Sequence, residues 1–265
     1  MLCLNNNKLS DINTFERVKF THLKILDLSC NKISNIKPLE KLKVEYLELL
    51  WLNNNNIKDI DALGNMNFKE LKILNLSYNE IIDIKVLDDN KFKNLEVLYL
   101  NNNKITDINV LENANLKKLK ELNLSFNKIS DIKVLEKIDF ENLEILNLNN
   151  NIITEISISR NKNFKKLKSI NLSGNNISGI YIFETVNFEK LKTLDLQNNG
   201  LTEIKIFKKL NLKELKELKL SYNKISDTTF FGNIQFEKLK IFSINNNQIS
   251  NINIIEKLNV EQLEI

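Results

Sequence analysis

The sequence predicts an α/β solenoid, in which each repeat adds one short strand to a parallel sheet. Asparagine returns every 24 residues, leucine and isoleucine keep fixed offsets from it, and apolar residues alternate with polar ones just before it. A fixed period of this length means that each repeat buries its apolar side against its neighbours. We therefore expect one elongated domain over residues 1–265, with about eleven repeats of 24 residues.

The stretch ELNLS at 121–125 shows why each repeat should contain a strand. Side chains alternate between the two faces of a strand, so Leu122 and Leu124 share one face while Glu121, Asn123 and Ser125 share the other. Consecutive strands that run in the same direction need a crossover between them. We expect a parallel sheet with neighbouring strands about 4.8 Å apart.

The residues after each strand are expected to return along the other side of the solenoid as short turns and helical fragments. Ile129, Ile132, Leu135 and Phe140 are the inward anchors of one such return path. An acidic residue recurs four positions after the asparagine, and we expect it to be the N-cap of a short helix. The acidic positions are Asp59, Asp83, Asp107, Asp131, Glu155 and Asp227.

The acidic positions also allow a calcium hypothesis, because carboxylates one repeat apart would form a column. Asn35, Gly179 and Asn251 interrupt that column, and helix capping explains the other members. We therefore expect no metal.

The recurring asparagine is predicted to be structural. Where the chain leaves a strand inside the solenoid, its backbone groups lose their partners, and buried polar groups need replacements. An asparagine amide both donates and accepts hydrogen bonds. Stacked asparagines could therefore bond the backbone of the neighbouring repeat as a ladder. The ladder residues are Asn31, Asn55, Asn79, Asn103, Asn127, Asn151, Asn175, Asn199, Asn223 and Asn247.

The repeat unit reads L-x-x-L-x-L-x-x-N-x-I-x-D-I-x-x-L and resembles the leucine-rich repeat family along the whole chain. Within that family it is most similar to the repeats of the protein phosphatase 1 regulatory subunit and of bacterial internalins. The resemblance implies a right-handed superhelix with a concave parallel sheet and short turns or helical fragments on the convex side. It also implies a non-enzymatic scaffold that binds a partner protein on the concave face.

The outward strand positions of the early repeats predict where the partner binds. These positions lie six and four residues before each asparagine, and they are more apolar in the early repeats than in the later ones. Exposed aromatic and aliphatic residues in one patch are typical of an interface, although β-branched residues also simply suit strands. The predicted partner-binding residues are Ile25, Asp27, Leu49, Trp51, Ile73, Asn75, Val97 and Tyr99.

A second period of 48 residues lies on the first, because the pair before the asparagine alternates between asparagine-rich and serine-led forms. This alternation places Tyr78, Phe126 and Tyr222 on every second turn at the rim of the sheet. Duplication of a pair of repeats explains it without a function.

Catalytic and metal-binding chemistry is not expected. His22 is the only histidine, the five glycines are scattered, and two cysteines with one histidine cannot complete a zinc site. Cys3 and Cys30 should lie about 11 Å apart, which is too far for a disulfide. We expect no enzyme activity and no cofactor.

The charge pattern indicates a mixed, solvated surface. The 38 basic residues are interleaved with 34 acidic ones, and almost all the bases are lysines. Nucleic-acid binders instead cluster their cations and favour arginine. No stretch approaches the apolar length of a membrane span. We expect a monomer that neither binds nucleic acid nor inserts into a membrane.

The compartment and the wider context stay open at this stage. The absence of a disulfide framework favours a reducing compartment, so we expect the cytoplasm. The N-terminus has no secretory signal, but a signal further upstream would make the protein secreted or surface-exposed. Internalin-like adhesion and the recognition arm of a larger signalling enzyme are the alternatives to a scaffold. Neither end shows a polar capping repeat, so we expect a piece of a longer array.

Overall fold

The computed structural model describes residues 1–88, 90–156, 162–180, 188–205, 207, 210–229, 231, 234, 236–251 and 263. Contacts group the chain into two compact units. The first unit comprises residues 1–128 and 138–140, and the second comprises residues 129–137 and 141–265. One continuous domain stays a prediction.

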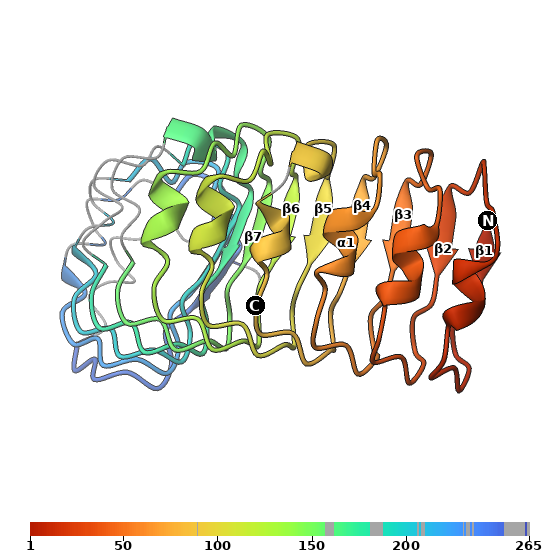
Figure 1. The fold of residues 1–265 in the computed structure, drawn as a ribbon. Helices are drawn as coiled ribbons and strands as arrows, with labels where there is room; N and C mark the ends of the chain where they lie inside the picture. The colour runs from red at the N-terminus through yellow and green to blue at the C-terminus, as the bar shows by residue number, and fades with distance from the viewer. Residues whose placement is uncertain are drawn as a thin grey trace. The chain divides into compact units, whose positions relative to one another are not determined.

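The first unit contains one parallel sheet whose strands follow chain order (Figure 1). Its strands are β1 (Leu2–Cys3), β2 (Ile25–Asp27), β3 (Leu49–Trp51), β4 (Ile73–Asn75), β5 (Val97–Tyr99) and β6 (Glu121–Asn123). Each strand residue pairs with the residue 24 positions later, as Leu26 does with Leu50. The period of the sequence is therefore the register of the sheet, which confirms the predicted fold class.

Short helices lie on one side of the sheet in the first unit (Figure 1). They are η1 (Asn13–Glu16), η2 (Lys37–Lys41), α1 (Ala62–Asn65), η3 (Lys85–Leu87), η4 (Asn90–Phe92) and η5 (Asn109–Glu112). All except α1 are 3-10 helices. A single turn suffices because each return path only has to reach the next strand.

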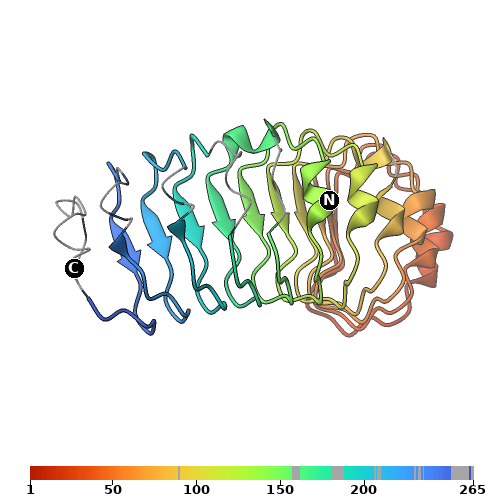
Figure 2. The ribbon, with the colours of Figure 1, turned by 90° about the vertical axis from the view of Figure 1, so that its left-hand side faces the viewer.

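The second unit repeats this plan, and Figure 2 shows its strands, coloured green to blue, in chain order. The strands are β7 (Ile145–Asn147), β8 (Ser169–Asn171), β9 (Thr193–Asp195), β10 (Glu217–Lys219) and β11 (Ile241–Ser243). The 3-10 helices that the structure describes there are η6 (Lys133–Glu136) and η7 (Lys162–Lys166).

The core of each unit lies between the strands and the return paths. Leu50 and Leu52 of one strand region have no exposed surface, and neither has Ile57 of the return path. The return paths end in buried phenylalanines, such as Phe92 in the first unit and Phe164 in the second. Because each repeat places the same residues inward, adjacent repeats continue one apolar column.

The predicted N-cap role of the aspartates is wrong, because they lie one or two residues before the N-cap of the short helix. The Oδ1 atom of Asp107 accepts the backbone N–H of Asn109 at 2.8 Å, two residues further on. The residue at the N-cap of η5 is Ile108, which makes no side-chain capping bond. Ile108 is buried in the core, so the short aspartate side chain forms its turn just ahead of the cap instead.

The return path changes where that aspartate is absent. Glu155, Gly179 and Glu203 occupy the same position in three consecutive repeats of the second unit. There the backbone forms parallel bridges, from Glu155 to Gly179 and from Gly179 to Glu203. Aspartate, or Asn35 in its place, accepts the N–H two residues later and leads into a short helix, whereas Glu155 and Gly179 lie in extended bridges.

The recurring asparagine bonds the backbone of its own repeat and of the preceding one. The Nδ2 group of Asn55 donates to the carbonyl oxygens of Leu28 at 3.0 Å and Leu52 at 3.1 Å. Its Oδ1 atom accepts the N–H of Ile33 at 2.9 Å. Asn223 makes the same bonds in the second unit, to Leu196, Leu220 and Leu201. Each such side chain thus closes the turn of the preceding repeat.

Replacing Asn127 with alanine should lower the free energy of unfolding by about 1–3 kcal/mol, because buried backbone groups lose their partners. The Asn127 side chain makes hydrogen bonds to the backbone of Leu100, Leu124 and Ile105. Its removal therefore leaves backbone groups of two repeats without their partners. Urea denaturation measures it.

Asn101→Ala is the matched control, because Asn101 is half-buried and its side chain makes no hydrogen bond to the described residues. It should change the free energy of unfolding by less than about 0.5 kcal/mol. Losses at Asn127, Asn79 and Asn103 no larger than that of the control would contradict the structural role.

Candidate functional site

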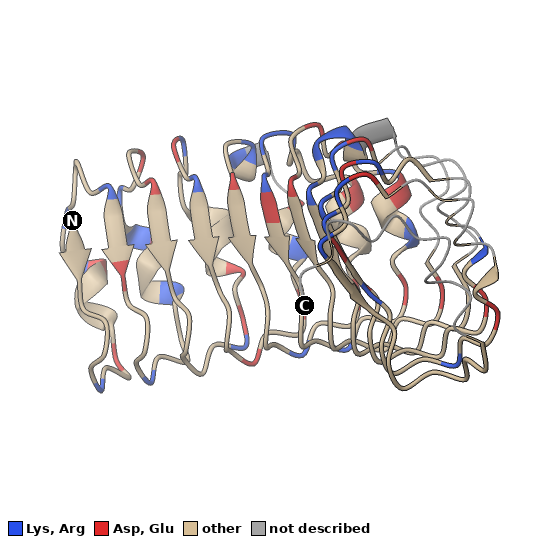
Figure 3. Cartoon of the chain, turned by 180° about the vertical axis from the view of Figure 1, so that it is seen from behind, with Lys and Arg blue, Asp and Glu red and all other residues tan. Residues whose placement is uncertain are grey.

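The sheet surface consists of the first and third residues of each strand. The middle residue, such as Leu50, is completely buried, so its neighbours Leu49 and Trp51 point to the opposite side. Figure 3 views the first unit from this side, with the strands in front of the helices. Nothing in the folding of the core requires apolar residues at these positions.

The structure brings the eight predicted partner-binding residues together on β2–β5. Ile25, Leu49, Ile73 and Val97 form one row, because they are register partners on adjacent strands. The third strand residues form a second, parallel row, which consists of Asp27, Trp51, Asn75 and Tyr99. We name these two rows together the apolar patch.

The members of the apolar patch differ in how accessible they are. Asp27 is only 6% exposed, and its Oδ1 atom accepts both the N–H and the Oγ–H of Ser29, at 2.9 and 2.6 Å. The other seven residues are half-buried. The Asp27 carboxylate is therefore already hydrogen-bonded to Ser29, at the end of its own strand. Trp51, Asn75 and Tyr99 instead have surface that a partner can contact.

Asn75 holds a fixed orientation between two aromatic rings. Its Oδ1 atom accepts the N–H of Ser77 at 3.1 Å and the Oγ–H of Ser77 at 2.7 Å. Its Nδ2 group makes no hydrogen bond to the described residues and lies on the strand between those of Trp51 and Tyr99. By strand spacing, the backbones of the two aromatic residues are about 10 Å apart. The site thus consists of two aromatic rings with one amide donor between them.

Sequence reasoning missed this clamp of an Asn or Asp by the serine two residues later. It recurs at Asn123 with Ser125 and at Asn171 with Ser173. The serines of these pairs belong to the 48-residue alternation, which was the signal in the sequence, although Ser221 follows Lys219 and bonds Asn245 instead.

Tyr99 closes one end of the apolar patch. Burial raises the pKa of its hydroxyl, and the neighbouring Glu121 carboxylate raises it further by charge and by a hydrogen bond. The hydroxyl is therefore protonated and the ring is neutral at physiological pH.

A second aromatic surface, the aromatic rim, consists of Tyr78 and Phe126. Each immediately precedes a ladder asparagine, and their exposed fractions are 52% and 50%. Their φ angles are +54° and +53°, which is the left-handed region that disfavours bulky residues. Asn54 and Asn102 occupy the same position in the alternate repeats, with φ of +55° and +56°. Asparagine tolerates this conformation, so the aromatic rings are held at a cost in strain.

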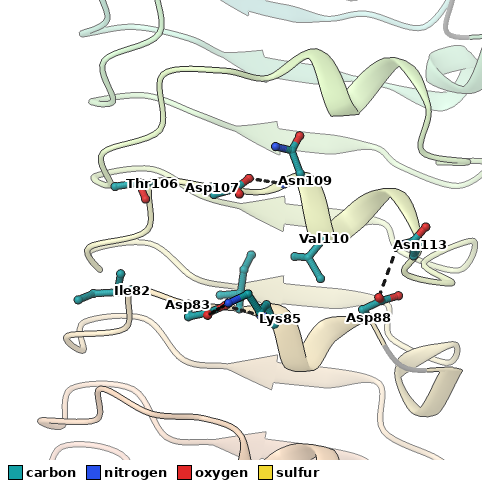
Figure 4. Close-up of a pocket in the computed structure, with 10 residues that line it drawn as sticks. Ile82, Asp83, Lys85, Asp88, Thr106, Asp107, Asn109, Val110 and Asn113 are labelled. Carbon is teal, nitrogen blue, oxygen red and sulfur yellow. Dashed lines mark hydrogen bonds and ion pairs between the residues drawn. The ribbon is translucent and has the colours of Figure 1, made fainter.

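A pocket of about 490 Å³ lies on the helix side, between the repeats of η3 and η5 (Figure 4). Its polar groups already bond one another. Lys85 forms an ion pair with Asp83 at 2.7 Å, and its side chain is the main reason that the pKa of Asp83 is lowered. Asp107 accepts the N–H of Asn109, as above. The pocket offers few groups for a ligand and is a weaker candidate than the sheet surface.

The remaining chemistry-bearing residues are dispersed. His22 stacks on Tyr46, with ring centroids 5.7 Å apart, and Cys3 and Cys30 are free thiols. Among the described residues, no group of three or more His, Cys, Asp or Glu side chains could hold a metal ion. Within the same part of the chain, no helix is long and apolar enough to span a membrane.

Comparison with family models matches repeats along most of the chain. The model described as leucine-rich repeats in two copies matches residues 1–41, 47–89, 93–137 and 189–233. A single leucine-rich repeat model matches residues 166–186. The search of curated protein sequences found no match.

Solved structures share the fold. An internalin from Listeria monocytogenes is 24% identical, with a TM-score of 0.60 over 99% of this chain and 84% of that chain. A leucine-rich repeat protein of Leptospira interrogans is 25% identical, with a TM-score of 0.69 over 97% of this chain and 70% of that chain. The ectodomain of the Arabidopsis thaliana receptor kinase GASSHO1/SCHENGEN3 is 24% identical, with a TM-score of 0.59. It matches over 91% of this chain and 34% of that chain.

Replacing Phe126 with asparagine should raise the free energy of unfolding by about 1 kcal/mol, because it removes a bulky residue from the left-handed region. Thermal and urea denaturation both measure this. Asn102→Phe is the converse variant in the neighbouring repeat and should lower stability by a similar amount. If both variants lower stability, the ring of Phe126 contributes more packing than its backbone costs, and the strain argument fails.

Proposed function

We propose that this chain, which belongs to the leucine-rich repeat family, is a non-enzymatic module that binds a polypeptide partner on the apolar patch of its first unit. The observation that carries the proposal is the arrangement of Trp51, Asn75 and Tyr99 on three adjacent strands. Two large rings flank one amide donor that has no acceptor among the described residues.

The rings supply the binding energy in this proposal. Tryptophan and tyrosine are enriched among the few interface residues that dominate affinity. Leu49, Ile73 and Val97 lie alongside them and extend the apolar contact. A partner that covers both rings would shield all these side chains from water at once, which favours association.

The amide donor supports a polypeptide as the partner. A peptide main chain presents a carbonyl oxygen at every residue, and Asn75 could donate to one of them while apolar side chains meet the rings. The plant ectodomain that shares this fold was determined in complex with CASPARIAN STRIP INTEGRITY FACTOR 2, so the fold can carry a bound partner. A cytoplasmic scaffold and a surface adhesion protein would use the same patch, and we favour the scaffold.

Selection of a random peptide library on the purified chain tests the proposal. The selected peptides should lose affinity by at least about tenfold, or 1.4 kcal/mol, on Trp51→Ala and on Tyr99→Ala. Isothermal titration calorimetry measures the affinity, and urea denaturation checks that each variant folds.

Asn147→Ala is the control. It replaces a half-buried polar residue of the sheet surface in the second unit and should leave affinity unchanged. Equal affinity of wild type and both aromatic variants would move the site elsewhere, with the aromatic rim as the next surface to test.

A further inference from the structure

The residue just before each strand forms a charged column that changes character along the chain. We name its positions the pre-strand column. In the first unit the signs alternate, and Figure 3 shows blue and red alternating where successive strands begin. The members in the first unit are Lys24, Glu48, Lys72, Glu96 and Lys120, and those in the second are Glu144, Lys168, Lys192, Lys216 and Lys240.

Alternation gives the first unit a series of ion pairs between repeats. Lys24 and Lys72 meet the two carboxylate oxygens of Glu48 at 3.1 and 2.8 Å, and Lys120 meets Glu96 at 2.7 Å. The side chain of Lys72, followed by that of Lys24, holds the pKa of Glu48 below its ordinary value. Each carboxylate therefore lies against a lysine from an adjacent repeat.

The alternation stops in the second unit. Lys168 still pairs with Glu144 at 2.6 Å, but the next position holds Lys192 where the pattern requires an acid. Backbone N–H groups of Lys192, Lys216 and Lys240 each donate to the carbonyl oxygen of the preceding member at 2.8 Å. We name Lys168, Lys192, Lys216 and Lys240 the basic column. Their backbones are hydrogen-bonded from each repeat to the next, about 4.8 Å apart.

The acidic residues near the basic column are largely engaged elsewhere. Glu214 pairs with Lys238 at 2.6 Å, and Glu217 pairs with Lys219 at 3.0 Å. Lys192 and Lys216 are exposed, and neither forms an ion pair with a described residue. Their charges do reach Glu214, whose pKa is lowered first by Lys238 and also by both of these lysines. Lys192 and Lys216 occupy equivalent positions in adjacent repeats, where like charges repel.

We propose that the basic column binds an acidic polypeptide segment, one with several aspartates or glutamates in a short stretch. Carboxylates placed along the column would restore the sign alternation that the first unit builds internally. The column consists of lysines only, which act as point charges, whereas nucleic-acid recognition favours the fork of arginine. The hydroxyl residues Ser169 and Thr193 follow two of the lysines and add neutral donors.

This site is separate from the apolar patch. It lies in the second unit, its chemistry is electrostatic, and it does not depend on Trp51 or Tyr99. Trp51→Ala should therefore leave binding to an acidic peptide unchanged, so failure of one proposal does not imply failure of the other.

Lys192→Glu is the decisive variant, because it restores the alternation. It should weaken binding of a fluorescent ten-residue glutamate-rich peptide by at least about tenfold at roughly 0.1 M salt, as measured by anisotropy. The same variant should raise the urea midpoint, since the new carboxylate would have lysine neighbours on both sides. Lys192→Gln should also weaken binding of the peptide, but it adds no carboxylate and therefore forms none of the new ion pairs that raise the urea midpoint.

Lys224→Glu is the matched control, with the same charge change on an exposed lysine of the second unit outside the column. It should weaken binding by less than about threefold. The proposal is overturned if wild type binds the acidic peptide no better than a glutamine peptide of equal length. Equal losses for Lys192→Glu and Lys224→Glu, or tighter binding of single-stranded DNA than of the acidic peptide, would also overturn it.

Discussion

The hydrogen bonds of the recurring asparagine are the interaction on which the rest of the structure depends. A solenoid must turn its backbone inside the molecule once in every repeat, where water cannot satisfy the freed polar groups. The Asn55 side chain replaces these partners with hydrogen bonds to three carbonyl oxygens and one N–H, from its own repeat and the preceding one. Because this bonding lies in the interior, it does not involve sheet-surface residues such as Leu49 and Trp51, which are available for binding.

The same turn imposes a second constraint on the residue just before the asparagine. Every such residue in the described repeats has a positive φ, including Gly174 at +66°. Asparagine or glycine suits that conformation, and this explains many of the asparagine pairs. Tyr78 and Phe126 depart from the rule, so the aromatic rim is a place where the chain accepts local strain.

Much of the fold could be predicted from the sequence because its period equals the register of the sheet. The alternation around Leu122 and Leu124 was enough to place the strand and its buried face. The capping role of Asp107 was misplaced by one residue, because only the structure shows that Ile108 must point into the core. Two features could not be predicted: the hydrogen bonds between Asn75 and Ser77, and the lack of an ion pair between Lys192 and any described residue. Both depend on side-chain geometry that spacing alone does not reveal.

Two surfaces of different chemistry follow from one repeat plan, with an apolar patch in the first unit and a basic column in the second. Both are possible because the asparagines satisfy the turns internally. Backbone amide hydrogen exchange at Ile57, Ile81 and Ile105, followed by NMR, tests this directly. These N–H groups lie outside strands and helices and donate only to the Oδ1 atom of the next asparagine. Protection comparable to that of the strand amides is the predicted result, and exchange as fast as at the exposed residue Thr106 would contradict the account.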